Sequence, residues 1–554
     1  MNNTWLKILS LFLFISCTAQ NEVVSTVSST SLNKSDKPKL VVGIVVDQMR
    51  YDYLTRFETK YGNGGFMRLI NEGYNCKNNH FNYVPTYTGP GHASVYTGTT
   101  PKYHGIISNN WYDRNLKDDV YCVEDPTYQP IGTDYKSDGV SPQRMLVSTV
   151  TDELKKFTQK QGKVIGIALK DRAAALPAGH SANAAYWFQG GQEGHWVTST
   201  FYMGQLPDWV EDFNNSNIAK SYLKVWDTYY DIETYTESGS DLNEFEGGFK
   251  GKETATFPYD LNKLKDNNKG FDILKSTPFG NNLTTDFTIA ALKGETLGQD
   301  NITDFLAVSY SSPDYIGHNF GVNSKEIEDT YIRLDKDIER LLNTLDDYVG
   351  EGHYTVFLTA DHGAVDVPAY LQTLHEPAGY FDSKSFQDQL LDFMTETYGA
   401  SDLIESISNN QIFLNRNKMV SMGLELGSVQ NTIVNEIISY KDIYKAYTAS
   451  TMATEYFDTG IEALLQKGFN QKRSGDVLFV LPPAVISYPK TGSTHGSGFN
   501  YDTHVPLLFY GKGIKTGSTN IKTEITDLAP TISALLNMSF PSGAVGKPLN
   551  FVLD

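Results

Sequence analysis

The sequence predicts an α/β protein with a doubly wound, mostly parallel sheet that is flanked by helices and carries inserted cap segments. Four segments are continuously apolar and rich in β-branched residues, as is typical of strands buried on both faces. Helical patterns lie between such segments, which favours a parallel sheet with helices on both sides. Each segment leads to charged residues, and sheets of this kind bind ligands beyond the carboxyl ends of their strands.

The strands and helices can be placed from local patterns. Strands are expected at 39–46, 163–169, 302–310 and 354–360, with two more at 476–481 and 504–510. A helix is expected after Asn323-Ser324, because apolar residues from Ile327 onward are spaced by threes and fours behind this capping pair. Asp527 similarly precedes a helix that begins at Leu528.

One catalytic domain is expected to span residues 38–554. Within it, the stretches 181–300 and 366–475 are rich in Tyr, Asn, Asp and Gly and lack such strands. We expect these two stretches to be insertions that form a cap beside the site. Their fold cannot be assigned from the pattern.

The composition of the 554 residues is that of a globular protein, with 40% apolar and 20% charged side chains. This balance excludes a disordered chain, a fibrous repeat and a polytopic membrane protein. The formal net charge of −19 repels the backbone of nucleic acids, so no nucleic acid polymer is expected as a partner. An anionic substrate must therefore be attracted by a local concentration of cations. We expect a monomer that acts on small molecules.

The start of the chain predicts export. Residues 1–19 form a signal peptide, because the apolar run 8–15 is shorter than the ~20 residues that span a bilayer. Two alternatives remain open, cleavage after Ala19 or a lipid anchor on Cys17, which follows a lipobox-like segment. Residues 20–37 form a polar, Ser-rich, flexible tether. The protein is expected in the periplasm or as an outer-membrane lipoprotein.

Two cysteines, Cys76 and Cys122, follow the leader. A disulfide between them and two buried free thiols are both compatible with the sequence.

Asp and His residues at the predicted strand ends point to a metal site. Asp314 and His318 are four residues apart, so on a helical turn they share one face and can hold one ion. A single Asp or His is more often part of a salt bridge, but six such residues at strand ends or adjoining turns favour catalytic zinc. Two sets of three ligands are predicted: Asp314, His318 and His495 form one, and Asp47, Asp361 and His362 form the other.

A nucleophile and a phosphate clamp can be proposed beside these ligands. Thr88 lies where a glycine-containing loop is expected to enter a helix, which suits an anion site, although a capping threonine is the commoner explanation. Lys170 and Arg172 are two residues apart on a predicted strand end, which sends both cations to one face. Two zinc ions and two cations, set against three carboxylates and an alkoxide, leave a charge of about +2, which matches a phosphate monoester dianion better than a diester.

These residues belong to longer segments that resemble the alkaline phosphatase superfamily, with a domain like that of type I phosphodiesterases and nucleotide pyrophosphatases. Within it, the chain is similar to the threonine-nucleophile, phosphate-irrepressible bacterial alkaline phosphatases. The segments that carry the resemblance are VVGIVVDQMR (41–50), YVPTYTGPGH (83–92), HGIISNNWYD (104–113), LKDRAAALPAGH (169–180), SSPDYIGHNFG (311–321), LTADHG (358–363), THGSGFNYDTH (494–504) and TDLAPTISALL (526–536).

The resemblance implies a role for each matching position. Thr88 matches the nucleophile, and Asn109, Lys170 and Arg172 match the phosphate-binding residues. The ligands of the zinc that holds the threonine match Asp47, Asp361 and His362, and those of the other zinc match Asp314, His318 and His495. Two zinc ions per chain are therefore expected. No magnesium is expected, because in this subgroup the lysine replaces the third metal of the serine enzymes.

The function implied is that of a secreted alkaline phosphatase (EC 3.1.3.1) that hydrolyses small phosphate monoesters through a phosphothreonine. The alternative is a phosphodiesterase or nucleotide pyrophosphatase with the same dizinc site, although those enzymes usually have an apolar wall in place of Lys170 and Arg172. A sulfatase lacks support, because the signature around its formylglycine is absent. A binding protein without activity would not be expected to retain every ligand.

Overall fold

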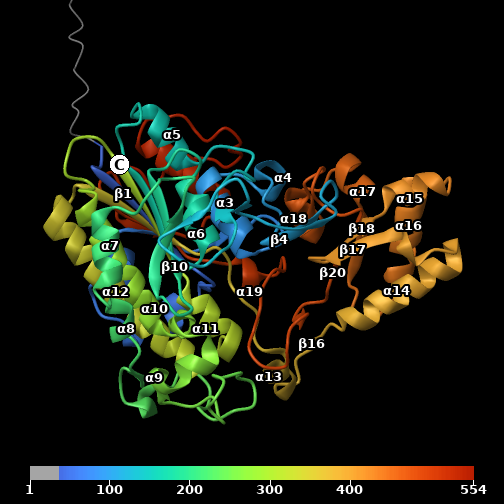
Figure 1. Ribbon diagram of the computed structural model, residues 1–554, viewed down its shortest axis with the longest axis horizontal. Coiled ribbons are helices and arrows are strands. Elements are labelled where there is room, and N and C mark those ends of the chain that lie inside the picture. Colours follow the sequence, from blue (N-terminus) through green and yellow to red (C-terminus); the bar gives the residue numbers. More distant parts are fainter. Residues whose placement is uncertain (1–36) are drawn as a thin grey trace, which may run out of the picture. The chain divides into compact units, whose positions relative to one another are not determined.

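The computed structural model describes residues 37–554, in which ten strands form one sheet in the order β23-β2-β22-β15-β1-β14-β9-β10-β11-β7 (Figure 1). In chain order these strands are β1 (Leu40–Val46), β2 (Tyr74–Cys76), β7 (Pro130–Ile131), β9 (Val164–Ala168), β10 (Ala184–Gln189), β11 (His195–Ser199), β14 (Asp304–Tyr310), β15 (Tyr354–Thr359), β22 (Leu507–Gly511) and β23 (Gly517–Thr519). The signal peptide, the lipidation alternative at Cys17 and most of the tether lie outside the described residues.

The centre of the sheet is parallel. Strands β15, β1, β14, β9 and β10 are neighbours and all run in the same direction. Strand β22 pairs antiparallel with β15, and β11 pairs antiparallel with β10. The predicted fold class is confirmed, and the four apolar segments that predicted it lie next to one another. Their carboxyl ends therefore meet at one edge.

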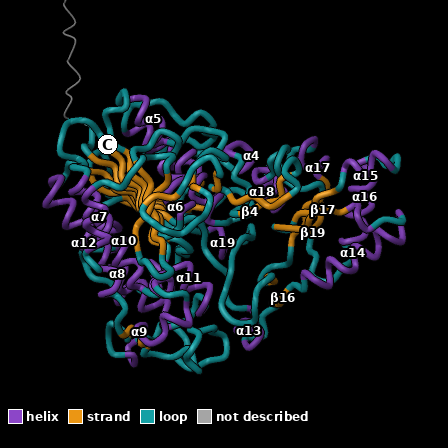
Figure 2. The backbone as a smooth tube through the Cα atoms, in the orientation of Figure 1, coloured by secondary structure: helices purple, strands orange, loops and turns teal. Residues whose placement is uncertain are grey.

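Helices cover both faces of this sheet (Figures 1 and 2). Helices α6 and α10 both contact strands β9 and β14. Helix α6 also packs against α3 and α5, and helix α10 packs against α7 and α12. Their bounds are α3 (Thr88–Thr97), α5 (Val150–Phe157), α6 (Asp171–Ala178), α7 (Asp208–Asn215), α10 (Pro278–Gly294) and α12 (Lys325–Leu345). Ser324 caps α12 as predicted, because its hydroxyl accepts a hydrogen bond from the amide of Ile327 at 3.2 Å. Helix α20 (Leu528–Leu535) follows Asp527, also as predicted.

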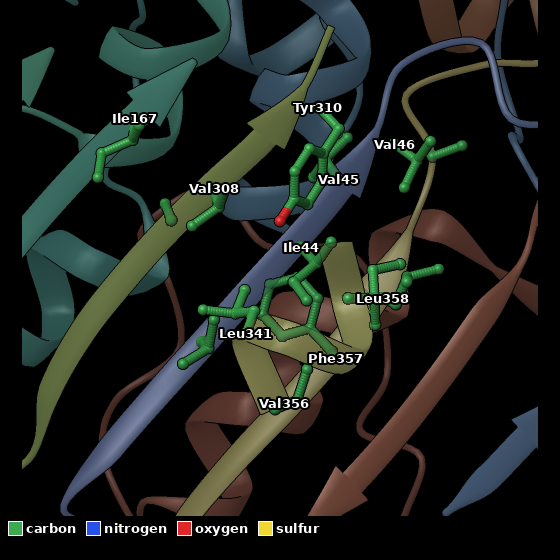
Figure 3. Packing of buried hydrophobic residues seen from close by; sticks show 14 of the residues in the cluster. Ile44, Val45, Val46, Ile167, Val308, Tyr310, Leu341, Val356, Phe357 and Leu358 are labelled. Carbon is green, nitrogen blue, oxygen red and sulfur yellow. The ribbon is translucent and has the colours of Figure 1, made fainter. Parts of the chain in front are cut away.

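The sheet and its helices enclose a hydrophobic core. All seven residues of β1 are buried. Figure 3 shows Ile44, Val308 and Val356 on the neighbouring strands β1, β14 and β15, with Leu341 of α12 nearby in the same cluster. Each such side chain contributes about 1.5–3 kcal/mol when it is buried fully. The core thus fixes the strands whose ends carry the polar residues.

Two expectations about the strands were wrong in part. The stretch 181–300 does contain two strands of the central sheet, β10 and β11, which are joined by a short turn. The segment at 476–481 does form a strand, β20 (Val477–Val480), but β20 lies in a separate antiparallel sheet. A short apolar run is compatible with either sheet, so its pairing could not be read from the pattern.

That separate sheet belongs to residues 379–486, called here the inserted lobe. Its strands pair in the order β17-β18-β20-β19 and its helices enclose a second hydrophobic cluster. The bounds are α14 (Ser383–Tyr398), β17 (Ile404–Ser408), β18 (Gln411–Leu414), α16 (Leu426–Ile437), β19 (Lys445–Thr448) and α18 (Gly460–Gly468). The inserted lobe thus has a sheet, helices and a hydrophobic core that are separate from those of the central sheet.

Two further questions from the sequence are answered for residues 37–554. Cys76 and Cys122 are both free and buried, which is the second of the two alternatives. No helix in this part of the chain has the length and apolar character needed to span a bilayer.

Helix α3 packs so closely against the end of β15 that Gly91 has no room for a side chain. A Cβ atom there would lie 2.3 Å from the carbonyl oxygen of Asp361. We expect Gly91→Ala to lower the free energy of unfolding by about 1–3 kcal/mol, measured by denaturant unfolding, because backbone must move apart. Gly204→Ala is the control, since nothing lies within 4 Å of its Cβ position. Equal stability of the two variants would contradict the close packing.

Candidate active site

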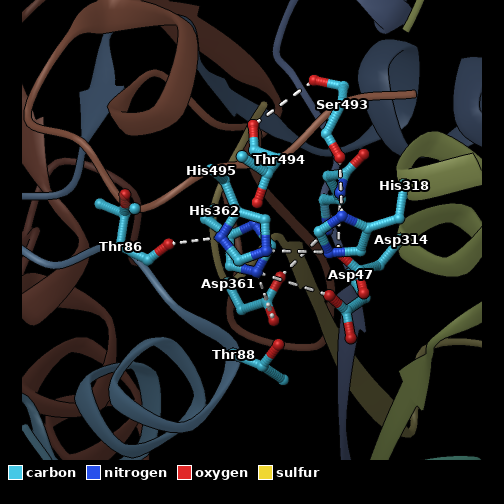
Figure 4. A network of polar contacts seen from close by, with 12 residues as sticks. Asp47, Thr86, Thr88, Asp314, His318, Asp361, His362, Ser493, Thr494 and His495 are labelled. Atoms are coloured by element: carbon cyan, nitrogen blue, oxygen red, sulfur yellow. Dashed lines mark hydrogen bonds and ion pairs between the residues drawn. The ribbon is translucent and has the colours of Figure 1, made fainter. Parts of the chain in front are cut away.

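Polar residues collect where the parallel strands of the sheet end. Asp47 directly follows β1, Asp361 follows β15 after one residue, and Lys170 follows β9 in the same way. Asp314 lies in helix α11 (Ser312–Phe320), which begins just after β14. Since these four strands are neighbours, residues as much as 314 positions apart in the chain come together (Figure 4).

One predicted ligand set forms a compact, fully buried group. The ligand atoms of Asp47, Asp361 and His362 all lie within 4.8 Å of one another. The Nε2 atom of His362 is 3.6 Å from Asp47 Oδ1 and 3.4 Å from Asp361 Oδ2. Each of these three atoms is buried without a hydrogen-bond partner among the described residues. Unpaired buried polar atoms are rare, and three that converge fit a bound cation.

The other predicted set forms a second group beside the first. His318 and Asp314 lie one turn apart on α11, with His318 Nε2 3.2 Å from Asp314 Oδ1. His495 reaches the same oxygen from the loop before α19 (Asn500–Thr503), at 3.5 Å. The ligand atoms of this group also lie within 4.8 Å of one another. Two carboxylate–imidazole groups side by side suit two metal ions with oxygen and nitrogen ligands.

The backbone sets which nitrogen of each histidine faces the site. The Nδ1 atoms of His318, His495 and His362 lie 2.7, 2.7 and 3.0 Å from the carbonyl oxygens of Ser493, Thr86 and Gly363, respectively. A carbonyl accepts a hydrogen bond, so Nδ1 carries the proton and Nε2 keeps a free lone pair. Burial lowers the pKa of His362 to about 3, so this imidazole is neutral at neutral pH and can act as a ligand.

Lys170 links the two groups. Its ammonium donates hydrogen bonds to Asp47 Oδ2, at 2.7 Å, and to Asp314 Oδ2. Burial and the nearby Asp361 carboxylate raise the pKa of Asp47 well above its ordinary value. Burial would do the same to Asp314, but His318 and Lys170 hold the pKa of Asp314 well below its ordinary range. His318 and Lys170 thus outweigh burial at Asp314 and keep its carboxylate negatively charged, whereas burial outweighs Lys170 at Asp47.

The local structure expected for Lys170 and Arg172 was wrong. Strand β9 ends at Ala168, Lys170 is the residue before α6, and Arg172 lies in the first turn of that helix. The alternation of side chains along a strand, which predicted that both cations lie on one face, therefore does not apply here. Both side chains still line one cavity of about 440 Å³, together with Tyr121 and Tyr315. Arg172 donates to the hydroxyl of Tyr121 at 3.1 Å, while its buried Nε has no partner in residues 37–554.

Thr88 is the first residue of α3 and is 1% exposed. Figure 4 shows its hydroxyl pointing toward the Asp361 carboxylate. Asn109 lies next to it in space, because its Oδ1 accepts a hydrogen bond from the amide of Gly89 at 2.7 Å. This bond fixes the orientation of the carboxamide and directs its NH₂ group away from the helix. The predicted nucleophile and the predicted phosphate ligand therefore share one helix N-terminus.

Gln48 was missed from the sequence. Its side-chain NH₂ group donates a hydrogen bond to Asp314 Oδ1 at 2.7 Å, and its backbone amide donates one to Asp361 Oδ1 at 3.1 Å. The backbone of Gln48 is left-handed, with φ of 64°, which lets the chain turn sharply after β1. Adjacency to Asp47 was the one available signal, and a glutamine carries no charge that would have marked it.

Residues 41–503 match the family described as type I phosphodiesterase / nucleotide pyrophosphatase. The chain is 44% identical to "Alkaline phosphatase PafA" of Elizabethkingia meningoseptica, over 94% of this chain and 95% of that protein. A protein named "Calcium-transporting ATPase" from Myroides odoratus is also 44% identical, over 94% and 96%. "Alkaline phosphatase PhoV" of Synechococcus elongatus is 43% identical, over 93% of both chains.

A solved structure supports the same relationship. The crystal structure of wild-type alkaline phosphatase PafA superposes with a TM-score of 0.90 at 44% sequence identity. The match covers 94% of this chain and 99% of that one. The similarity therefore extends over nearly the whole of both chains.

Loss of one ligand should remove one metal ion. We expect His495→Ala to lower the content of bound divalent metal by one equivalent per chain, measured by elemental analysis. Chelation of the wild type should lower its melting temperature, because an ion that binds only the folded state stabilises it. His353→Ala is the control, since that exposed side chain lies outside both groups. Unchanged metal content in His495→Ala would exclude the second group as a metal site.

Proposed function

Because the chain belongs to the type I phosphodiesterase / nucleotide pyrophosphatase family, we propose how its site hydrolyses phosphate monoesters. Phosphatase activity follows from relatives named alkaline phosphatases at 44% and 43% identity over more than nine-tenths of the chain. The observation that supports the mechanism is the convergence of both ligand groups, Lys170 and Thr88 at one edge of the sheet.

Two zinc ions would be held by the two groups. One would be bound by Asp47, Asp361 and His362, together with the Thr88 oxygen, and the other by Asp314, His318 and His495. When bound, they would supply Lewis acidity at the attacking and leaving oxygens. The Lys170 ammonium already lies between Asp47 and Asp314, so it supplies positive charge there and no magnesium is expected.

The reaction is proposed as two in-line displacements. The Thr88 oxygen attacks phosphorus, the alcohol departs, and a phosphothreonine forms. Water then attacks the phosphothreonine and releases inorganic phosphate, which restores the hydroxyl of Thr88. The two halves balance as one monoester plus one water giving one alcohol and one phosphate. Thr88 lies at the N-terminus of α3, where the positive end of the helix dipole stabilises the negative charge that develops during the attack.

The nonbridging oxygens would be bound by three side chains. An ammonium has three N–H donors, and Lys170 uses two of them on carboxylates, which leaves one for the substrate. Arg172 has five donors, of which one is occupied by Tyr121. The NH₂ group of Asn109 is the third contact. These cations favour a dianionic monoester over a singly charged diester.

The alternative is a phosphodiesterase, which the family description also includes. Export to the periplasm, the choice between a free chain and a lipid anchor on Cys17, the monomeric state and the role of the insertions as a cap remain part of the proposal.

Removal of the nucleophile should stop turnover without disturbing the metals. We expect Thr88→Ala to lower kcat by about a thousandfold or more while zinc content stays at the wild-type level. Thr88→Ser is the matched control, because it keeps a hydroxyl and should retain most activity. A Thr88→Ala enzyme with full activity would refute the assignment.

The two cations should discriminate between substrate classes. We expect Lys170→Ala/Arg172→Ala to lower kcat/KM for a phosphate monoester about 10–100-fold more than for its methyl diester, because charge-assisted hydrogen bonds are lost. Arg172→Ala alone is measured in parallel, since Arg172 has no contact with either ligand group, and metal content is determined for both. Equal losses for the two substrates would argue against charge matching.

A further inference from the structure

The inserted lobe reaches the loop that carries Asn109. Strands β17 and β18 form a hairpin whose two-residue turn is Asn409-Asn410. Both turn residues are left-handed, with φ of 53° and 56°. Asparagine tolerates this conformation, and two such residues in succession are typical of a tight hairpin turn. The turn therefore presents its side chains in a fixed orientation.

The side chain of Asn409 forms hydrogen bonds with both sequence neighbours of Asn109. Its Oδ1 accepts a hydrogen bond from the Ser108 hydroxyl at 2.8 Å, and its Nδ2 donates to the carbonyl oxygen of Asn110, also at 2.8 Å. Asn409 and Asn110 are 299 positions apart in the chain. One carboxamide thus ties down the residue before and the residue after the proposed phosphate ligand.

Asn109 is held from two other directions as well. Its carboxamide oxygen accepts from the amide of Gly89, and its carbonyl oxygen accepts from the amide of Cys122 at 2.9 Å. These bonds fix one end of the side chain and one point of the backbone. The two bonds of Asn409, called here the clamp, restrain the segment further, at the Ser108 hydroxyl and at the Asn110 carbonyl, so they help to preorganise the NH₂ group.

The lobe is anchored beside this clamp by stronger contacts. Strand β4 (Asn110–Asp113) follows Asn109 directly. Tyr112 donates to Glu405 of β17 at 3.2 Å, and Arg114 donates to the fully buried Asp476 at 2.9 Å. A charge-assisted bond to a buried carboxylate is well able to hold two segments together. The turn is therefore kept in reach of Ser108 and Asn110.

We propose that Asn409 is a positioning residue for Asn109, through which the inserted lobe sets the affinity of the site for the phosphoryl group. The inference rests on the proposed function, since it requires Asn109 to bind phosphate. Without the clamp, the segment from Ser108 to Asn110 gains freedom, and part of it must be ordered again each time phosphate binds.

The test uses glycine variants of the full-length, metal-loaded enzyme. Asn409→Gly removes the side chain but keeps the left-handed turn, and Asn410→Gly is the matched control in the same turn. We expect Asn409→Gly to raise the inhibition constant of inorganic phosphate and to lower kcat/KM about tenfold, as the loss of two hydrogen bonds implies. Asn410→Gly should change neither by more than about twofold.

A double-mutant cycle separates positioning from a general structural role. In the Asn109→Ala background, Asn409→Gly should cause no further loss, because the group that it positions is gone. An undiminished tenfold loss in that background would overturn the inference. If Asn409→Gly does not fold, Ser108→Ala replaces it, since it removes one of the same bonds from the other side.

The two levels of the proposal fail differently. If Asn109→Ala weakens phosphate binding but both Asn409→Gly and Ser108→Ala leave it unchanged, the positioning role is wrong and the proposed function stands. If Asn109→Ala itself leaves phosphate binding unchanged, the role of Asn109 in the proposed function is wrong, and the inference is overturned with it.

Discussion

Three carboxylates that are almost completely buried lie together at the ends of β1, β14 and β15, and their repulsion is the constraint on which the site depends. Asp47, Asp361 and Asp314 are 0%, 0% and 3% exposed. Buried charges persist only when they are paired, so cations must be held among them. Lys170 supplies one, and the unpaired atoms of Asp47, Asp361 and His362 converge where another can bind. The same carboxylates that repel one another are thus the groups suited to bind a metal ion.

The backbone around the site serves that same requirement. Carbonyl oxygens hold three imidazoles with Nε2 turned inward, and the amides of Gly89 and Gln48 orient a carboxamide and a carboxylate. Few of these groups could be shifted without leaving a buried polar atom unpaired. Preorganisation of this kind lets donors meet the charge of a transition state without moving first.

The inserted lobe has its own sheet and core, yet its hairpin turn contacts the loop that carries Asn109. The contacts of Asn409 with Ser108 and Asn110, and of Arg114 with Asp476, join the lobe to the segment that carries Asn109. In the proposed role of Asn409, the lobe acts on phosphate binding through Asn109 and does not contribute a residue that contacts phosphate.

The sequence by itself determined the parallel sheet, its four central strands and the residue types gathered at their ends. It could do so because a strand buried on both faces leaves a continuous apolar run, and the ends of parallel strands meet at one edge. Capped helices such as α12 were equally local signals. Only the tertiary structure decided that Lys170 and Arg172 lie at the start of a helix and that β20 joins the second sheet. It also decided that Gln48 contacts Asp314 and that Asn409 contacts the neighbours of Asn109. Their partners lie hundreds of positions away, and a neutral amide carries no periodicity or charge that would reveal such a contact in advance.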